Sequence, residues 1–320
     1  MEEKEKRKLT IVIPCYNEEE IIEHCIKQLL QLLKNLIDKD LISNASSLCF
    51  VNDGSSDATK KIIKEYCKKN KKISLISLSK NFGQQAAIRA AIENIEADIV
   101  ITLDADLQDD ISVVETMIKE YYKGNEIVYG CRKNRKYDTY LQKISSFLFY
   151  KLANLLKVKI RYNHAEFRLL SKKAIEFLKE YKEKTMFLRG VIQNIGLKSC
   201  DVFYDRQKRI AGKSKYNFIK LTKYALKAIT NSSCHPLKLI SLIGFVLILL
   251  AFILIFCNKM PYVQNILSKN LSILLGFTTL YNGIILISLG LIAEYISKIL
   301  IEVKAQPIFQ IEQMINIEKY

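Results

Sequence analysis

The chain has 320 residues, 49% of them hydrophobic, which is enough for one α/β domain with its own core and a smaller appendage. The formal net charge of +16 fits nucleic acid, an anionic membrane surface or an acidic substrate as partner, and charge alone does not choose among them. The eight cysteines form no CxxC pair and no Cys/His cluster with metal-ligand spacing, so they indicate reduced thiols in a cytosolic compartment. The charged N-terminus, residues 1–8, lacks the apolar stretch of a signal peptide.

Short β-rich runs alternate with helical patterns in the N-terminal part of the chain. The runs that predict strands are residues 9–13, 48–51, 73–78, 99–103 and 127–129. The segments with helical periodicity are residues 19–34, 58–68 and 84–95. This alternation predicts right-handed crossovers and a mostly parallel sheet with helices on both faces.

Polar residues follow four of these predicted strands. They are Pro14 to Glu18, Asn52 to Asp57, Ser79 to Gly83, and Asp104 to Asp109. In an open parallel sheet the ligand site forms at the carboxyl ends of the strands, so we expect the four segments to line one crevice. Each segment alone is also typical of an ordinary turn or helix cap.

Asp104 and Asp106 lie two residues apart at the end of a predicted strand, whose period of two can direct both carboxylates to one side. Hard oxygen ligands suit Mg²⁺ or Mn²⁺, which prefer sites completed by a substrate's phosphates. A DxD pattern alone more often marks a solvated acidic turn. Its place after an apolar strand and before Gln108 favours a metal site.

Other nucleotide-binding motifs are absent. No GxGxxG follows the first predicted strand, and the glycine that a P-loop needs before Gly212-Lys213-Ser214 is replaced by Gln207. No motif interleaves the basic residues with aromatics as a nucleic-acid surface would, so we expect no nucleic-acid partner.

Two long apolar segments follow. Residues 239–257 contain no charged residue, and residues 271–293 contain only Asn282 as a markedly polar residue, so each is long enough for a transmembrane helix. The flanking lysines predict both termini on the cytoplasmic side. Lysines 220, 223 and 227 share one face of a predicted helix, which indicates an interfacial helix before the first span.

These patterns predict four parts: a cytosolic α/β domain (1–216), an interfacial helix with linker (217–236), a two-helix transmembrane hairpin (237–302) and a cytosolic tail (303–320). The predicted location is therefore the cytoplasmic membrane, with several spans and the α/β domain in the cytoplasm.

Several motifs resemble family-2 glycosyltransferases of the polyisoprenyl-phosphate type, which include dolichol-phosphate mannose synthases and bactoprenol glucosyltransferases. The motifs are VNDGSSD at Asp53, SKNFGQQAAIRAAI, TLDADLQD, HAEFRLLSKKA at 164–174, FLRG at 187–190 and YDRQKRIAGKSKY at 204–216. The resemblance covers nearly the whole chain. It implies a GT-A-like fold and inverting, metal-dependent transfer of a sugar from a UDP- or GDP-linked donor to a polyisoprenyl phosphate, by a homo-oligomer at a membrane.

The resemblance also implies residue roles. The donor would be held by Pro14, Tyr16, Glu18, Asp53, Lys80, Ala105 and Arg132. The ion, Mg²⁺ or Mn²⁺, would be held by Asp104, Asp106 and Gln108. Catalysis would involve Asp104, Asp106, Glu166 and Arg206, and the acceptor phosphate would meet Arg168, Arg209, Ser214 and Lys215.

Alternatives stay open at some of these positions. Glu166 stands where an Asp is common in the family, and a structural ion pair with an arginine explains it as well. The basic residues around 206–215 also suit simple attraction to anionic lipid. A processive polysaccharide synthase would need a QxxRW motif, which a chain without tryptophan cannot have. A non-catalytic scaffold that binds a nucleotide sugar and partners a flippase is the remaining alternative.

Overall fold

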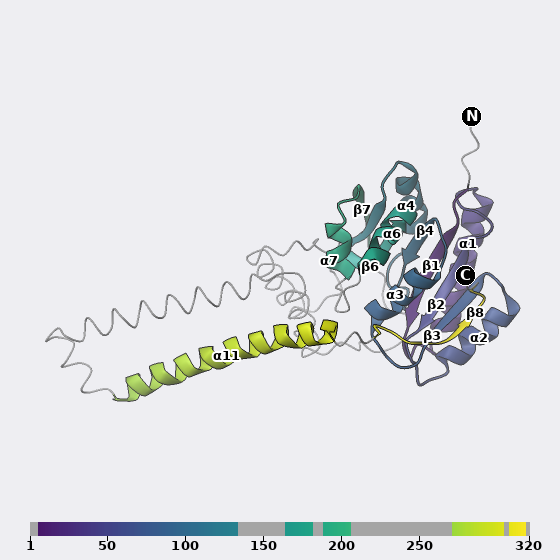
Figure 1. Ribbon diagram of the computed structural model, residues 1–320. Helices are drawn as coiled ribbons and strands as arrows, with labels where there is room; N and C mark the ends of the chain where they lie inside the picture. The colour runs from purple at the N-terminus through teal and green to yellow at the C-terminus, as the bar shows by residue number, and fades with distance from the viewer. Residues whose placement is uncertain (1–5, 134–163, 182–187, 206–270, 304–306, 318–320) are drawn as a thin grey trace. The chain divides into compact units, whose positions relative to one another are not determined.

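The computed structural model describes residues 6–133, 164–181, 188–205, 271–303 and 307–317 (Figure 1). The chain divides into two compact units, one containing the sheet with its flanking helices and the other containing helix α11 (Leu271–Val303). The predicted boundaries at residues 216 and 236 lie outside the described residues.

Within the described residues, one sheet has eight strands in the order β7-β5-β6-β4-β1-β2-β3-β8. The neighbours β4, β1, β2 and β3 run parallel, whereas β6 is antiparallel to both β4 and β5, and β8 is antiparallel to β3. The strands are β1 (Leu9–Cys15), β2 (Ser47–Asn52), β3 (Ile73–Leu78), β4 (Ile99–Thr102), β5 (Ile127–Arg132), β6 (His164–Ser171), β7 (Ser199–Tyr204) and β8 (Ile311–Ile315).

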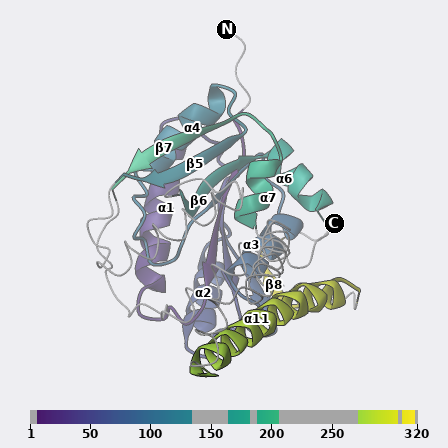
Figure 2. The same cartoon turned by 90° about the vertical axis from the view of Figure 1, so that its left-hand side faces the viewer.

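Helices cover both faces of the sheet, and each face has its own core (Figure 2). The helices α1 (Ile22–Asp38), α2 (Thr59–Lys69) and α4 (Val113–Tyr122) pack on one face, and α3 (Gln84–Asn94), α6 (Lys172–Glu180) and α7 (Leu188–Asn194) pack on the other. In β1, Ile11 and Ile13 join the first core and Val12 joins the second. Strand alternation therefore supplies both cores from the same apolar runs.

The five predicted strands and three predicted helices are all present, with slightly different ends. The expectation of a mostly parallel sheet is corrected to a mixed sheet, because β6 and β8 run antiparallel to their neighbours. Strand β6 was not predicted, since its sequence carries the charged pair Glu166 and Arg168 in buried positions and so lacks the apolar pattern of a core strand.

Strand β8 comes from the segment for which the sequence predicted only a tail. It pairs with β3, and the Ser79 N–H donates to the Gln310 carbonyl at 2.9 Å. The Asn316 side chain donates to the carbonyls of Cys67 and Ile73, both at 2.8 Å. The end of the chain thus covers the β3 edge, which would otherwise present unpaired backbone groups.

The structure does not confirm the predicted membrane segments. The predicted interfacial helix at 217–236 and the first predicted span at 239–257 lie outside the described residues, and α11 contains the residues that were predicted as the second span. Across the described ranges, none of the helices meets the combined length and apolarity needed to cross a bilayer. The predicted multi-pass location in the cytoplasmic membrane is corrected on this finding.

Candidate active site

Four polar loops lie at the carboxyl edge of the parallel strands β4, β1, β2 and β3. The register pairs Cys15 with Asn52 at the ends of β1 and β2, and β4 ends beside β1 at Thr102. Because these parallel strands are adjacent, the residues after each of them share one edge of the sheet. The structure therefore brings together the segments 14–18, 52–57, 79–83 and 104–109.

The first two loops are bonded to each other. The Asn17 N–H donates to the Ser55 hydroxyl at 3.0 Å, and the Ser56 N–H donates to Asn17 Oδ1 at 2.9 Å. The Glu18 N–H donates to Thr59 Oγ1 at 2.8 Å, at the start of α2. These contacts fix the loop that carries Pro14, Tyr16 and Glu18, and they leave the Tyr16 ring exposed at this edge.

Asp53 connects the second loop to the third. Its two carboxylate oxygens accept the N–H groups of Phe82 at 2.7 Å and Gly83 at 2.9 Å. Burial raises the pKa of this carboxyl group, and the two N–H groups only partly offset that rise. In the structure Asp53 thus holds the loop before α3, and its contact with a nucleoside stays a prediction.

Gly54 allows these two loops to touch. Its φ is +64°, and a Cβ at this position would lie 2.3 Å from the backbone carbon of Lys80. Only glycine fits so close an approach in this conformation. Lys80 itself is exposed, and its Nζ lies 5.2 Å from the centroid of the Phe82 ring.

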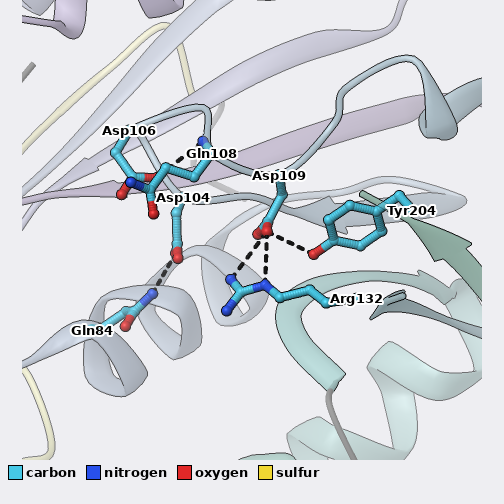
Figure 3. A network of polar contacts seen from close by, with 7 residues as sticks. All are labelled: Gln84, Asp104, Asp106, Gln108, Asp109, Arg132 and Tyr204. Carbon is cyan, nitrogen blue, oxygen red and sulfur yellow. Dashed lines mark hydrogen bonds and ion pairs between the residues drawn. The ribbon is translucent and has the colours of Figure 1, made fainter. Parts of the chain in front are cut away.

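The loop at residues 104–109 carries the DxD pattern. Strand β4 ends at Thr102, so Asp104 and Asp106 lie on a turn, and strand alternation does not set their directions. Figure 3 shows Asp104 turned toward Gln84 at the start of α3, whose Nε2 donates to Asp104 Oδ1 at 2.6 Å. Asp106 lies beside Gln108, and its Oδ1 accepts the Gln108 N–H at 3.3 Å.

Buried apolar side chains anchor this loop. Ala105 and Leu107 alternate with the two aspartates and pack into the core. Leu107 has a φ of +47°, a conformation that few residues other than glycine adopt. The contacts of Ala105 and Leu107 with the core therefore hold the loop in one conformation, and the polar residues of the loop lie at the edge of the sheet.

Asp104, Asp106 and Gln108 supply two carboxylates and one amide from a single loop. Among the described residues, no group of three or more His, Cys, Asp or Glu side chains is placed to hold a metal ion. A small set of hard oxygen ligands fits Mg²⁺ or Mn²⁺ bound together with substrate phosphates, because such ions rarely have all-protein cages. The residues present suit an ion that arrives with a diphosphate.

Asp109 joins its loop to the ends of the two strands β5 and β7, a role that sequence reasoning missed. Its Oδ1 accepts Nε and Nη2 of Arg132 at 3.2 and 3.0 Å and the Tyr204 hydroxyl at 2.6 Å (Figure 3). Burial and the Asp109 charge raise the pKa of Tyr204. Burial alone would lower the pKa of Arg132, but Asp109 and Tyr204 together outweigh it and raise that pKa. Arg132 is therefore a fixed cation beside the 104–109 loop.

Glu166 and Arg168 form an ion pair within β6. Both side chains are almost fully buried, and Gln85 Nε2 donates to Glu166 Oε1 at 2.9 Å. The Thr102 hydroxyl also bonds to the Glu166 carbonyl. This arrangement favours the structural ion pair that the sequence left open, and contact of Arg168 with an acceptor phosphate stays a prediction.

Residues 10–178 match the model for glycosyl transferase family 2. The uncharacterized glycosyltransferase YkoT of Bacillus subtilis is 41% identical over 310 residues, which cover 95% of this chain and 91% of that protein. The chain belongs to glycosyl transferase family 2. This confirms the family seen in the motifs, and the fold is accordingly α/β and GT-A-like, with a mixed sheet and flanking helices.

Other relatives of this glycosyltransferase carry more specific names. An Escherichia coli protein called prophage bactoprenol glucosyl transferase homolog is 33% identical over 96% of this chain and 99% of its own. The bactoprenol glucosyl transferase of Shigella phage SfII is 33% identical over 96% and 98%. Among solved structures, a Pyrobaculum calidifontis mannosyltransferase with GDP-Man and Mn²⁺ is similar at 14% identity and a TM-score of 0.46, covering 92% of this chain and 88% of that one.

The structure thus brings together part of the predicted site of this glycosyltransferase. The side chains at or beside the carboxyl edge are Pro14, Tyr16, Glu18, Asp53, Lys80, Asp104, Ala105, Asp106, Gln108, Arg132, Glu166 and Arg168. Arg206, Arg209, Ser214 and Lys215 lie outside the described residues. The residues that sequence reasoning missed are Gln84, Gln85, Asp109 and Tyr204, although all four lie in or next to the quoted motifs.

Proposed function

We propose that this glycosyltransferase moves a sugar from a UDP- or GDP-linked donor to a polyisoprenyl phosphate and inverts the anomeric carbon. The observation that carries the proposal is the fixed loop 104–109, with its two aspartates at the same sheet edge as the loops 14–18 and 52–57. The acceptor class is supported by similarity along nearly the whole chain to proteins named bactoprenol glucosyl transferases.

The proposed reaction is a single displacement. A phosphate oxygen of the lipid forms a bond to the anomeric carbon, and the bond from that carbon to the donor diphosphate breaks. The nucleoside diphosphate leaves with the electron pair. The attacking phosphate is already largely anionic near neutral pH, so this step needs no strong general base from the protein.

The chain's own residues would stabilise the charges that develop. Asp104, Asp106 and Gln108 would hold Mg²⁺ or Mn²⁺, whose charge offsets the negative charge on the departing diphosphate. Arg132 lies next to that loop and keeps its positive charge, so it is suited to a donor phosphate. The loops carrying Tyr16 and Asp53 would hold the nucleoside.

A donor panel tests the proposal. The purified full chain is incubated with Mn²⁺ or Mg²⁺, polyisoprenyl phosphate in detergent micelles, and UDP- or GDP-linked sugars in turn. We expect one donor to yield a lipid-linked sugar with inverted anomeric configuration, detected by mass spectrometry and NMR. If no donor is consumed while a nucleotide sugar still binds, the non-catalytic scaffold replaces this proposal.

A further inference from the structure

The first turn of α3 touches two of the acidic residues of the candidate site. Gln84 Nε2 donates to Asp104 Oδ1 at 2.6 Å, and Gln85 Nε2 donates to Glu166 Oε1 at 2.9 Å. The two carboxylates come from different strands, since Asp104 follows β4 and Glu166 lies in β6. Two adjacent glutamines therefore each hold one acidic side chain.

The backbone before these glutamines is fixed from another direction. Asp53 accepts the N–H groups of Phe82 and Gly83, and Gly83 has a φ of +93° directly before the helix. The position of Gln84 is thus set by the loop contacts of Asp53. Its side chain transmits that position to Asp104, because a carboxylate bonded at one oxygen has a defined direction for the other.

We propose that Gln84 is a positioning residue that orients Asp104 toward a divalent cation, whereas Gln85 orients Glu166 and has no part in cation binding. This inference rests on the proposed function, because it takes Asp104 as an ion ligand. A short charge-assisted hydrogen bond to a ligating carboxylate fixes its rotamer before the ion arrives. Glu166 already has Arg168 as a second partner, so Gln85 acts on an ion pair instead.

A purely architectural role is the competing explanation. In that case Gln84 and Gln85 would both tie α3 to the neighbouring strands, and replacing either would lower the stability of the sheet by similar amounts. A measurement of cation binding distinguishes the two explanations. Only the positioning role predicts that substitutions of Gln84 and of Gln85 affect cation binding differently.

The experiment compares Gln84→Met with Gln85→Met in the full chain. Methionine keeps the length of the side chain and removes the amide donor. Mn²⁺ is titrated in the presence of saturating UDP or GDP, and free Mn²⁺ is measured by electron paramagnetic resonance, so no turnover is needed. We expect Gln84→Met to raise the Kd for Mn²⁺ about tenfold and Gln85→Met to leave it within about twofold.

Gln84→Asn serves as a second variant. It keeps an amide but is one methylene shorter, so it should also weaken Mn²⁺ binding, and it gives the answer if Gln84→Met does not fold by circular dichroism. Unchanged binding in the folded Gln84 variants, or equal weakening in Gln85→Met, overturns the inference alone. Absence of Mn²⁺ binding in the wild-type chain overturns both the ion site and this inference.

Discussion

Two arginines of this glycosyltransferase pair with carboxylates in different surroundings. Arg168 and Glu166 lie two residues apart in β6, with side chains that are 2% and 6% exposed. Arg132 ends β5 and reaches across to Asp109, and its side chain is 27% exposed. The motifs suggested a phosphate contact for both arginines, but the burial of the two side chains differs. Both members of the first pair are enclosed in the sheet, whereas in the second pair Asp109 is 2% exposed and only Arg132 is partly exposed.

The different burial of the two arginines gives each a different expected effect on stability when its ion pair is broken. When an arginine and its carboxylate partner are both buried, their pairing chiefly prevents either charge from being unpaired in the core. An arginine at the strand ends whose side chain is partly exposed can pair with a structural carboxylate and can also contact a substrate. We therefore expect the loss in the free energy of unfolding on breaking an ion pair to increase with the burial of that pair.

The largest effect is expected from Arg168→Met. It leaves Glu166 buried without its ion-pair partner, and the free energy of unfolding should fall by about 3 to 5 kcal/mol. Urea unfolding followed by circular dichroism measures the change. Adding Glu166→Gln to the same chain removes the orphaned charge and should restore a large part of the loss. A loss below about 1 kcal/mol for Arg168→Met would show that the pair does not stabilise the sheet.

Asp109→Asn should lower the free energy of unfolding by less than Arg168→Met does, about 2 kcal/mol, because Arg132 is partly solvated after it loses its charged partner. The same variant should also slow sugar transfer, since Asp109 ties the 104–109 loop to β5 and β7. Urea unfolding and initial rates are measured together. If stability and rate both match the wild type, this network neither stabilises the loop nor supports the reaction.

Tyr204→Phe removes one hydrogen bond to Asp109 and keeps the ring, which packs edge-on against Phe167 at 5.6 Å between centroids. We expect a loss of about 1 to 1.5 kcal/mol in the free energy of unfolding. Tyr16→Phe is the matched control, because the Tyr16 side chain is exposed and the same change there should cost under about 0.5 kcal/mol. Equal losses in the two variants would contradict the account.

Lys60→Met should have the smallest effect. It breaks the 2.8 Å ion pair with Glu312, which joins α2 to β8 and is half exposed on the Glu312 side. Solvated pairs of this kind contribute about 0.2 to 1 kcal/mol. A thermal melt at low and at high salt checks this, since screening should remove most of the difference. A loss in the free energy of unfolding comparable with that of Arg168→Met would contradict the expectation that the loss increases with burial.

The parts of the fold and site that were predictable from sequence are those with local signals. The run Ile99 to Leu103 followed by Asp104 predicts a strand with a polar loop directly after it, and the strand and the loop are both present. The network of Asp109, Arg132 and Tyr204 depends on β7 lying beside β5, with Arg132 opposite Tyr204. That pairing joins segments far apart in the chain, so no local pattern reveals it.

Strand β6 and strand β8 show two further reasons for missing elements. The residues of β6 from Glu166 to Ser171 are all buried, but the charged pair Glu166 and Arg168 interrupts the apolar run that would predict a core strand. Strand β8 is five residues long and returns to the sheet after α11. Gln84 and Gln85 were visible in a motif, but their partners depend on where α3 begins relative to β4 and β6.

We propose that the loop 104–109 holds a divalent ion for sugar transfer. The most direct measurement is the initial rate of lipid-linked sugar formation against Mn²⁺ concentration for the wild type, Asp104→Asn and Asp106→Asn. We predict no rate without a divalent ion and a fall of at least about 100-fold in each variant, with unfolding midpoints close to the wild type. Full activity of either variant, or an undiminished wild-type rate in EDTA, would contradict the account.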